Sequence, residues 1–564
     1  MLADALGPSD PVVGPALPGI VEAVLANFGS VDSPELREYS HLALANLSAA
    51  LKEGFGPYVP RAVALAIATC EQSDGDLVRG DGDGGDAASE DIGSEDSDDT
   101  GGGGSSGSGS DDDDAGGRGF RVRTGVVEEK AAATHAVGAY ADAAAAAVAP
   151  HADALAALLK AGSQHLHEEV RAAAHEALPK LVLAVHRAAS PGAAPAGAGA
   201  PAPQQVSAQA RQMAGGAVAL LLESLDTDPD KPAVSAAVAA IVVLLEALGG
   251  AAFEQQQLEA VARAAASVLQ GEAACQQEEE DDEDEPGGGG GGGGGGSGFD
   301  EDDAGEEDEE LISAAADLLP ALAAAVGPQA YAPVFLSLHL APLLARLRPR
   351  EAAGVRGIAA GALAEVCEKL GALAAPAAEQ ALPPLIRELR SEDPINRQNA
   401  AFACGMIAHT CPQQASPLMP QLLQALHPLF RPEEEPGARD NAAGAVGRTL
   451  LAMGAALPVE QIVPVLVSAL PLQEDLEETA PVCAALCQLL TGDAALQQRV
   501  SPHLPAIVQA FGRVGVQDAA PMAARRQVAQ VLLQLQGQFA AVVGPLVAAL
   551  PADQQTTLQQ LASG

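Results

Sequence analysis

The side chains that could do chemistry in this sequence are mostly carboxylates, and they gather in two runs. One run spans Asp111 to Asp114, and the denser one reads EEEDDEDE. Closely spaced carboxylates attract Lys and Arg, so these runs predict salt-dependent binding of a basic partner. The alternative is a solvated insertion that only aids solubility. The residues of the denser run are Glu278, Glu279, Glu280, Asp281, Asp282, Glu283, Asp284 and Glu285.

The other reactive side chains do not follow the pattern of a catalytic or metal site. The densest histidines, His165, His167 and His175, have no further ligand nearby in sequence, and we interpret them as solvated helix ends. The DGDGGD segment lacks the twelfth-position Glu of a calcium loop. The ten consecutive glycines precede acids rather than GK[ST], which argues against a phosphate loop. We therefore predict no enzyme, no cofactor and no metal.

A second polar pattern recurs at a fixed interval. Arg356 opens RGIAAGALAEV. The segment RQNAAFACGMI begins 41 residues later, and RDNAAGAVGRT begins 42 residues after that. Equivalent polar side chains in adjacent repeats predict a ladder that ties successive turns together and satisfies helix ends. Contact with a partner is the alternative. The candidate residues are Arg397, Asn399, Arg439, Asp440 and Asn441.

The segments between these arginines also repeat. A Pro or small residue stands two positions before an apolar pair, as in PGIVEAV at Pro18 and PRAVALA at Pro60, 42 residues later. Five further intervals, starting at Ala341, are 42, 37, 44, 41 and 39 residues. A period near 40 is typical of HEAT and armadillo repeats, and it gives roughly ten of them.

Composition supports an all-α fold. Aromatic residues are only 2% of the chain, while Ala and Leu, which favour helices, are abundant. We therefore predict an all-α, HEAT-repeat (armadillo-like) superhelical solenoid. The Arg-led segment is interpreted as helix A and the Pro-led segment as helix B. In this interpretation the B helices line the concave inner face.

Low-complexity stretches divide the array. We predict HEAT repeats over 1–73, beginning inside a repeat as a truncated chain would. Disordered acidic insertions are expected at 74–117 and 276–310, because neither can bury apolar surface. Repeats are expected again over 118–275, with an Ala/Pro/Gly loop near 190–205, and over 311–564.

Charge and cysteine usage limit the partners and the compartment. The formal net charge of −45 repels nucleic acid and anionic membranes. Seven scattered cysteines without a CxxC pair fit a reducing compartment.

The uncharged stretch 318–345 contains four prolines, so we expect a turn at 327–333 rather than a membrane span.

Several segments, in order, resemble one family, the importin-β superfamily of karyopherins, and within it the importin-four type. The resemblance covers nearly the whole chain outside the insertions, and the run EEEDDEDE occurs where this branch has an acidic run. The segments that carry it are REYSHLALANLSAALKEGFGPYVP, VRTGVVEEKAAATHAVGAYA, EEVRAAAHEALPKL, INRQNAAFACGMI, ARDNAAGAVGRTLLA and LPLQEDLEE.

The resemblance implies a nuclear import receptor, of which this chain is similar to the C-terminal, cargo-binding half. Such receptors bind basic cargo such as histones or ribosomal proteins and contact Phe-Gly nucleoporins. They release cargo to Ran-GTP, whose main site the resemblance places in N-terminal repeats, and they shuttle between cytoplasm and nucleus. The alternatives are a HEAT scaffold subunit without a transport role and an acidic histone chaperone.

Overall fold

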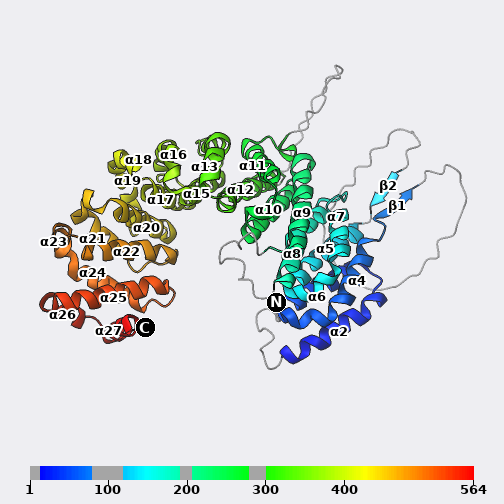
Figure 1. Ribbon diagram of the computed structural model, residues 1–564, viewed down its shortest axis with the longest axis horizontal. Helices are drawn as coiled ribbons and strands as arrows, with labels where there is room; N and C mark the ends of the chain where they lie inside the picture. Colours follow the sequence, from blue (N-terminus) through cyan, green and yellow to red (C-terminus); the bar gives the residue numbers. More distant parts are fainter. Residues whose placement is uncertain (1–12, 79–118, 123, 191–205, 278–299, 564) are drawn as a thin grey trace, which may run out of the picture.

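The computed structural model describes residues 13–78, 119–122, 124–190, 206–277 and 300–563. Within them the chain is almost entirely helical, and helices adjacent in sequence stack on one another along a curved array (Figure 1). The predicted all-α HEAT-repeat solenoid is confirmed. The acidic residues Glu278 to Glu285, for which we predict binding of a basic partner, lie outside the described residues. So do most of both acidic insertions and of the loop near 190–205.

One layer of the solenoid is a continuous stack in which each helix packs on the next. Its members are α3 (Pro34–Leu51), α5 (Thr124–Ala143), α8 (Glu168–Ala189), α10 (Lys231–Leu248), α12 (Asp300–Val326), α15 (Ala353–Leu370), α17 (Pro394–Thr410), α20 (Pro436–Met453), α22 (Thr479–Thr491) and α25 (Met522–Gln538).

The second layer contains the helices that alternate with this stack. They are α2 (Leu17–Asn27), α4 (Val59–Cys70), α6 (Ala145–Val148), α7 (Ala152–Gly162), α9 (Ala208–Thr227), α11 (Gln255–Gln270), α13 (Pro328–Val334), α14 (Leu340–Arg346), α16 (Ala375–Glu388), α18 (Pro412–Ala415), α19 (Met419–Leu426), α21 (Val459–Ala469), α23 (Ala494–Val500) and α24 (Leu504–Val516). The helices α26 (Ala540–Ala548) and α27 (Ala552–Ser563) pack on α24 and α25 at the end of the array.

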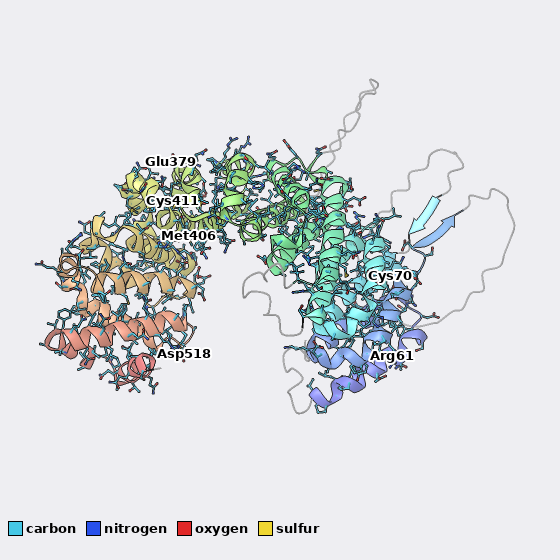
Figure 2. All side chains as sticks on the ribbon, in the orientation of Figure 1. Arg61, Cys70, Glu379, Met406, Cys411 and Asp518 are labelled. Atoms are coloured by element: carbon cyan, nitrogen blue, oxygen red, sulfur yellow. The ribbon has the colours of Figure 1, made fainter. Side chains whose placement is uncertain are left out.

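The two layers are the reverse of the predicted arrangement. The Arg-led helices α15, α17 and α20 lie along the inner side of the arch, and the Pro-led helices α16, α19 and α21 lie along its outer side (Figure 1). Figure 2 shows this directly, with Met406 of α17 on the inner side and Glu379 of α16 on the outer side. The assignment of the Pro-led helices to the concave face was therefore wrong.

Small residues explain why the Arg-led helices occupy the inner layer. A Cβ atom added to Gly405 of α17 would lie 2.4 Å from the Cα atom of Ala445 on α20. On the inner side of a curved stack the helices must approach closely, and Gly and Ala permit that approach. The Gly- and Ala-rich Arg-led segments fit this layer, while the bulkier Leu-rich segments fit the outer one.

The bounds of the acidic insertions differ from those predicted. A two-stranded antiparallel ladder of β1 (Gly75–Val78) and β2 (Gly119–Val122) brackets the first insertion. The helix α12 begins at Asp300, so residues 300–310 are helical although they fall in the predicted loop 276–310. Carboxylates are favourable in the first turns of a helix, where they face its positive end, so acidic composition alone did not exclude a helix.

Two further features concern apolar helices. The expected turn at 327–333 is shorter in the structure, because α13 already begins at Pro328, after Gly327 with φ +83°.

Among the described helices, α10 is long and apolar enough to cross a membrane, and two bent helix pairs qualify if each counts as one span. In the solenoid α10 packs between α8 and α12, where Val234 and Ile241 are buried.

Candidate binding groove on the inner face

Three successive inner helices, α3, α5 and α8, form a groove of about 700 Å³. Each helix contributes four lining residues with the same spacing, at a first position and then three, four and seven residues later. This spacing places all four on one helical face. The lining residues are Glu35, Glu38, Tyr39 and Leu42 of α3; Glu128, Ala131, Ala132 and His135 of α5; and Glu169, Ala172, Ala173 and Glu176 of α8.

The equivalent positions form rows that cross the three helices. The first row is Glu35, Glu128 and Glu169, so every helix presents one exposed carboxylate at the same edge of the groove. The second and third rows are alanines on α5 and α8, which make a shallow apolar floor. We call Glu35, Glu128 and Glu169 the carboxylate row. A surface of this kind suits a cationic ligand with an aliphatic stem.

A cation stands two residues after each member of the carboxylate row; Lys130 and Arg171 are buried, and Arg37 is partly buried. Arg37 donates to Glu129 Oε1 at 3.0 Å and to the Val31 carbonyl at 3.0 Å. Lys130 donates to the Gln72 carbonyl at 2.6 Å, and Arg171 donates to the His165 carbonyl at 2.8 Å.

Arg37 and Arg171 hold the turns before α3 and α8, and Lys130 joins α5 to the segment after α4. The three cations pair with Glu129, Asp74 and Asp228 rather than with the carboxylate row. Within the row, Glu35 also accepts a hydrogen bond from Ser33 Oγ.

The carboxylates around the groove affect the pKa of one neighbouring side chain, Glu38. Burial, together with the nearby charges of Glu128, Glu169 and Glu35, raises the pKa of Glu38. On the far edge, His135 Nδ1 lies 3.8 Å from Glu176 Oε2, and both side chains are about half exposed. The neighbouring His135 ring lowers the pKa of Glu176. A bound cation would relieve the repulsion around Glu38.

The carboxylate row does not continue into three later inner helices. Two residues before Arg356, Arg397 and Arg439, the chain has Gly354, Ile395 and Gly437. A second group of exposed carboxylates, Glu246 of α10, Asp317 of α12 and Glu365 of α15, lies on the inner stack without forming a described groove. The groove at α3, α5 and α8 is therefore a local feature of the solenoid.

The predicted ladder residues Arg397 and Asn399 make contacts between neighbouring repeats. Arg397 Nη1 donates to the carbonyls of Ser391 and Glu392, both at 2.8 Å, and its Nε donates to Glu434 at 3.1 Å. Asn399 Nδ2 donates to the Gly357 carbonyl of α15 at 3.2 Å. These bonds satisfy backbone groups at helix ends and favour the ladder over a partner contact.

The three ladder candidates of α20 reach the segment before α22. Asp440 accepts hydrogen bonds from the backbone N–H groups of Gln473, Glu474 and Asp475 at 2.8, 2.7 and 3.2 Å. Asn441 Nδ2 donates to Asp475 at 2.9 Å. The third candidate, Arg439, donates to Gln473 Oε1 at 3.2 Å. Asp440 and Asn441 are buried, which again favours the ladder.

The histidines proved to be different from the solvated helix ends that we expected. His175 is fully buried, and its Nδ1 lies 2.9 Å from the Ala233 carbonyl. His165 Nε2 lies 3.1 Å from Asp74. In the part of the chain that the structure describes, no group of three or more His, Cys, Asp or Glu side chains could hold a metal ion.

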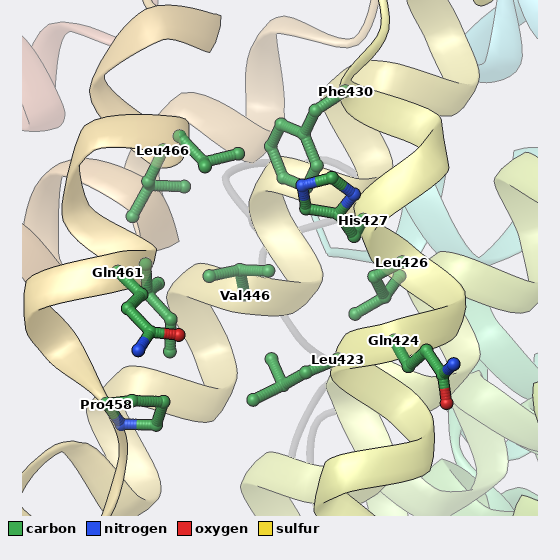
Figure 3. A pocket seen from close by; sticks show the side chains of 11 residues that line it. Leu423, Gln424, Leu426, His427, Phe430, Val446, Pro458, Gln461 and Leu466 are labelled. Atoms are coloured by element: carbon green, nitrogen blue, oxygen red, sulfur yellow. The ribbon is translucent and has the colours of Figure 1, made fainter.

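The outer face carries an apolar groove of about 330 Å³ between α19 and α21 (Figure 3). Leu423 and Phe430 line one wall, Ile462 and Leu466 line the other, and Val446 of the inner helix α20 forms the floor. Its lining is therefore mostly aliphatic, with the rings of Phe430 and His427 and the amides of Gln424 and Gln461. Such a groove suits an apolar side chain from a partner.

The inner groove was missed by our reasoning from the sequence, although a signal was present. The segments ELREYSHL, EEKAAATH and EVRAAAHE each have Glu two residues before a basic residue. Aligning them on that basic residue brings the three glutamates into register. In the later Arg-led segments the equivalent position is not acidic, so their repeat pattern does not reveal the row.

Comparison with known proteins gives a local sequence match. Over 164 residues the chain is 37% identical to Importin-4 of Homo sapiens, a segment that covers 29% of this chain and 15% of the human protein. The matched segment is therefore a small part of that relative's length. No protein-family model matches the chain.

Comparison with solved structures gives a match over nearly the whole chain. The crystal structures of Kap121p bound to Nup53p and of Kap121p bound to RanGTP match with TM-scores of 0.64 and 0.62. In both, 97% of this chain aligns with 46% of Kap121p at 15% identity. Because the identity is low, this match concerns the fold, which is that of the karyopherin solenoid. Together with the local Importin-4 match, it makes this chain similar in fold, and over part of its sequence, to importins of the importin-4 type.

Proposed function

We propose that this chain is the cargo-binding part of a nuclear import receptor, and that the groove on α3, α5 and α8 binds a basic segment of the cargo. The carboxylate row carries the proposal. Three exposed glutamates in register line one edge of a groove, and the buried cations beside them are already paired. Histones and ribosomal proteins have basic segments of the required charge, and they are the proposed cargo.

The transport cycle is proposed from the names of the similar proteins. The human relative is named Importin-4, and Kap121p has been crystallised with RanGTP and with Nup53p. We propose that the longer protein shuttles between cytoplasm and nucleus and releases its cargo to Ran-GTP. Because the chain aligns with less than half of Kap121p, the Ran site is not assigned to residues of this chain.

The proposed contact with Phe-Gly nucleoporins has a candidate site of its own. The groove between α19 and α21 lies on the outer layer, opposite the cargo groove, and its lining is mostly aliphatic. A Phe side chain would pack between Leu423 and Ile462 above Val446. Cargo and nucleoporin could then be bound at once on opposite faces.

The proposal is tested by binding measurements on the full chain. A labelled Lys/Arg-rich peptide should bind at low salt, and its affinity should fall steeply as NaCl is added, because the contacts are exposed ion pairs. A peptide with Lys and Arg replaced by Gln is the control. Equal binding of the two peptides would contradict a cargo groove.

Two rival functions are separated by further partners. A Phe-Gly repeat peptide should bind this chain, and Val446→Asp in the outer groove should remove that binding. Ran-GTP should displace basic cargo from the longer protein. If a basic peptide binds, but the Phe-Gly peptide does not and Ran-GTP displaces no cargo, an acidic histone chaperone is favoured. If the basic peptide also fails to bind, a HEAT scaffold subunit is favoured.

A further inference from the structure

Exposed arginines gather at one place on a chain whose net charge is strongly negative. They lie in the last turn of α16 and in two consecutive turns that lead from an outer helix to the next inner helix. The first turn, 347–352, joins α14 to α15, and the second, 389–393, joins α16 to α17. We call these exposed residues the arginine patch: Arg348, Arg350, Arg387 and Arg390.

Contacts between the two repeats bring the patch together. Arg387 Nη2 donates to the Leu347 carbonyl at 3.3 Å, which places the end of α16 against the first of the two turns. Arg348 and Arg390 are 42 residues apart and occupy equivalent positions of adjacent repeats. Because packed helices have axes about 8–10 Å apart, the patch extends over roughly 10 Å along the edge of the solenoid.

The charges of the patch are only partly neutralised. Arg350 Nε donates to Glu351 at 3.1 Å, and Arg346 donates to the same carboxylate at 3.1 Å, so one anion serves two guanidinium groups. The Arg350 side chain is still 72% exposed. Within the described residues, Arg348 and Arg390 form no ion pair. The patch therefore presents guanidinium groups that can pair with a ligand.

Stabilisation of helix ends accounts for only part of this cluster. A cation in the last turn of a helix is favourable, which explains Arg346 in α14 and Arg387 in α16. The other three patch members, Arg348, Arg350 and Arg390, lie beyond the last residues of these helices. They need another reason to be there.

Equivalent turns along the same edge have the opposite charge. The turn 228–230 before α10 contains two aspartates and no basic residue. The turn 470–475 before α22 contains Glu474 and Asp475 and again no basic residue. The turn 431–435 before α20 contains three glutamates and one Arg. The arginine patch is therefore a local reversal of charge.

We propose that the arginine patch is a docking surface for a short acidic segment of a partner protein. Charge complementarity selects this occupant. A patch limited to two turns matches a few carboxylates, whereas a long polyanion such as RNA would run onto the acidic turns and be repelled. The guanidinium group is a planar fork that can hold a carboxylate by two hydrogen bonds, which suits a patch built from Arg alone.

This inference does not rest on the proposed cargo groove. The patch lies on the edge of the solenoid at α14 to α17, and the groove lies on α3, α5 and α8. An acidic partner and a basic cargo are therefore bound at separate places.

The net charge of −45 gives the proposed contact an unusual dependence on salt. The Debye length is about 30 Å at 0.01 M salt, so an acidic peptide is then repelled by the chain as a whole. At about 0.1 M it is about 10 Å, and the peptide interacts chiefly with the patch. At about 1 M the patch is screened as well. Affinity should therefore pass through a maximum near 0.1 M, whereas that of a basic peptide falls throughout.

The test uses fluorescence anisotropy of the full chain with a labelled ten-residue peptide of Glu, Asp and Gly. Arg348→Gln together with Arg390→Gln should weaken binding about ten-fold near 0.1 M NaCl, because each exposed ion pair adds a few-fold. Arg348→Lys with Arg390→Lys keeps the charge and should still weaken binding several-fold, since Lys lacks the planar fork. The control, Arg211→Gln with Arg526→Gln, removes two other exposed arginines and should leave the affinity unchanged.

Four results would overturn the proposal. A peptide with Gln and Asn in place of the acids that binds as well would exclude recognition of charge. Equal weakening in the control variant would exclude the patch. Tighter binding of a single-stranded RNA of equal charge would assign the patch to nucleic acid.

The fourth result concerns an acidic run of this chain. Arg346 Nε donates to the Leu269 carbonyl at 2.9 Å, nine residues before Glu278. If the acidic peptide binds only after the carboxylates from Glu278 to Glu285 are replaced by Gln and Asn, the patch belongs to that run rather than to a partner. The cargo groove is tested with basic peptides, so it stands or falls separately.

Discussion

Arg171 and Asp228 form a buried two-point ion pair between positions 57 residues apart. The Nε and Nη2 atoms of Arg171 donate to the two carboxylate oxygens of Asp228 at 2.7 and 3.0 Å. Both side chains are less than a tenth exposed. The pair ties the start of α8, which carries Glu169 of the groove, to the segment between α9 and α10. The groove is thus fixed by a contact with the next repeat.

Removal of Asp228 should destabilise this part of the solenoid. Asp228→Ala removes the buried carboxylate of this pair and leaves Arg171 with Asp230, so the loss of charged hydrogen bonds should cost about 1.5–3 kcal/mol. Asp142→Ala is the control, because Asp142 and its partner Arg187 are both about half exposed. That pair should contribute less than about 1 kcal/mol. Urea unfolding followed by circular dichroism measures both, and equal effects would contradict the structural role of the buried pair.

The close approach of α17 and α20 predicts opposite effects for two glycine substitutions. In Gly405→Ala the new Cβ atom meets Ala445 backbone, so the free energy of unfolding should fall by about 1–3 kcal/mol. In Gly361→Ala on α15 nothing lies within 4 Å of the new atom. That change should raise stability by roughly 0.5–1 kcal/mol through helix propensity. A neutral Gly405→Ala in thermal unfolding would mean that the two helices are not in close contact.

Burial of His41 predicts acid destabilisation. Burial lowers the pKa of His41 to about 4, although Glu129 nearby favours the charged form and Arg37 opposes it. The unfolded chain binds this proton near pH 6.5, so the neutral histidine contributes fully above that pH. Its contribution is lost as pH falls from 6.5 to about 4, by up to about 3 kcal/mol.

The measurement compares thermal unfolding of wild type and His41→Gln at several pH values. The difference in stability between the two should shrink in acid. An unchanged difference down to pH 4 would show that His41 is not held neutral in the folded chain.

The raised pKa of Glu38 predicts proton release on binding of basic cargo. Because its pKa is raised, Glu38 keeps its proton to a higher pH than an ordinary glutamate does. A cation in the groove favours the ionised form, so binding should expel that proton and tighten as pH rises. Calorimetry in buffers of different ionisation enthalpy counts the released protons. Glu38→Gln should reduce the count, and an unaltered count would assign the release to another carboxylate.

The acidic run from Glu278 to Glu285 remains a predicted second contact for basic cargo. Replacing its eight carboxylates by Gln and Asn should weaken binding of a long basic protein at low salt. The effect should be small at high salt, where exposed charges are screened. Unchanged affinity at low salt would reduce this run to a spacer. A short peptide that fills only the inner groove serves as the control ligand.

The sequence by itself determined the fold, because a solenoid is made of local contacts. A period near 40 and Ala- and Leu-rich helices specify a unit that must stack on its neighbours. The recurring polar residues, among them Arg397 and Arg439, also led to the prediction of a ladder, and Asn399 and Asp440 bond residues of neighbouring repeats. The sequence did not decide which layer lies inside, because both helix types are amphipathic and both have an apolar face.

Only the tertiary structure decided where the inner groove lies. Glu35, Glu128 and Glu169 stand 93 and 41 positions apart, since an insertion separates the first two. Because the insertion lengthens the first interval, a search for a fixed period does not align Glu35 with the other two glutamates. In addition, a single exposed Glu on a helix has no distinguishing pattern. Stacking of α3, α5 and α8 brings the three carboxylates into one row around Glu38, whose pKa is raised by burial and by their charges, because Coulomb energy depends on distance in space rather than along the chain.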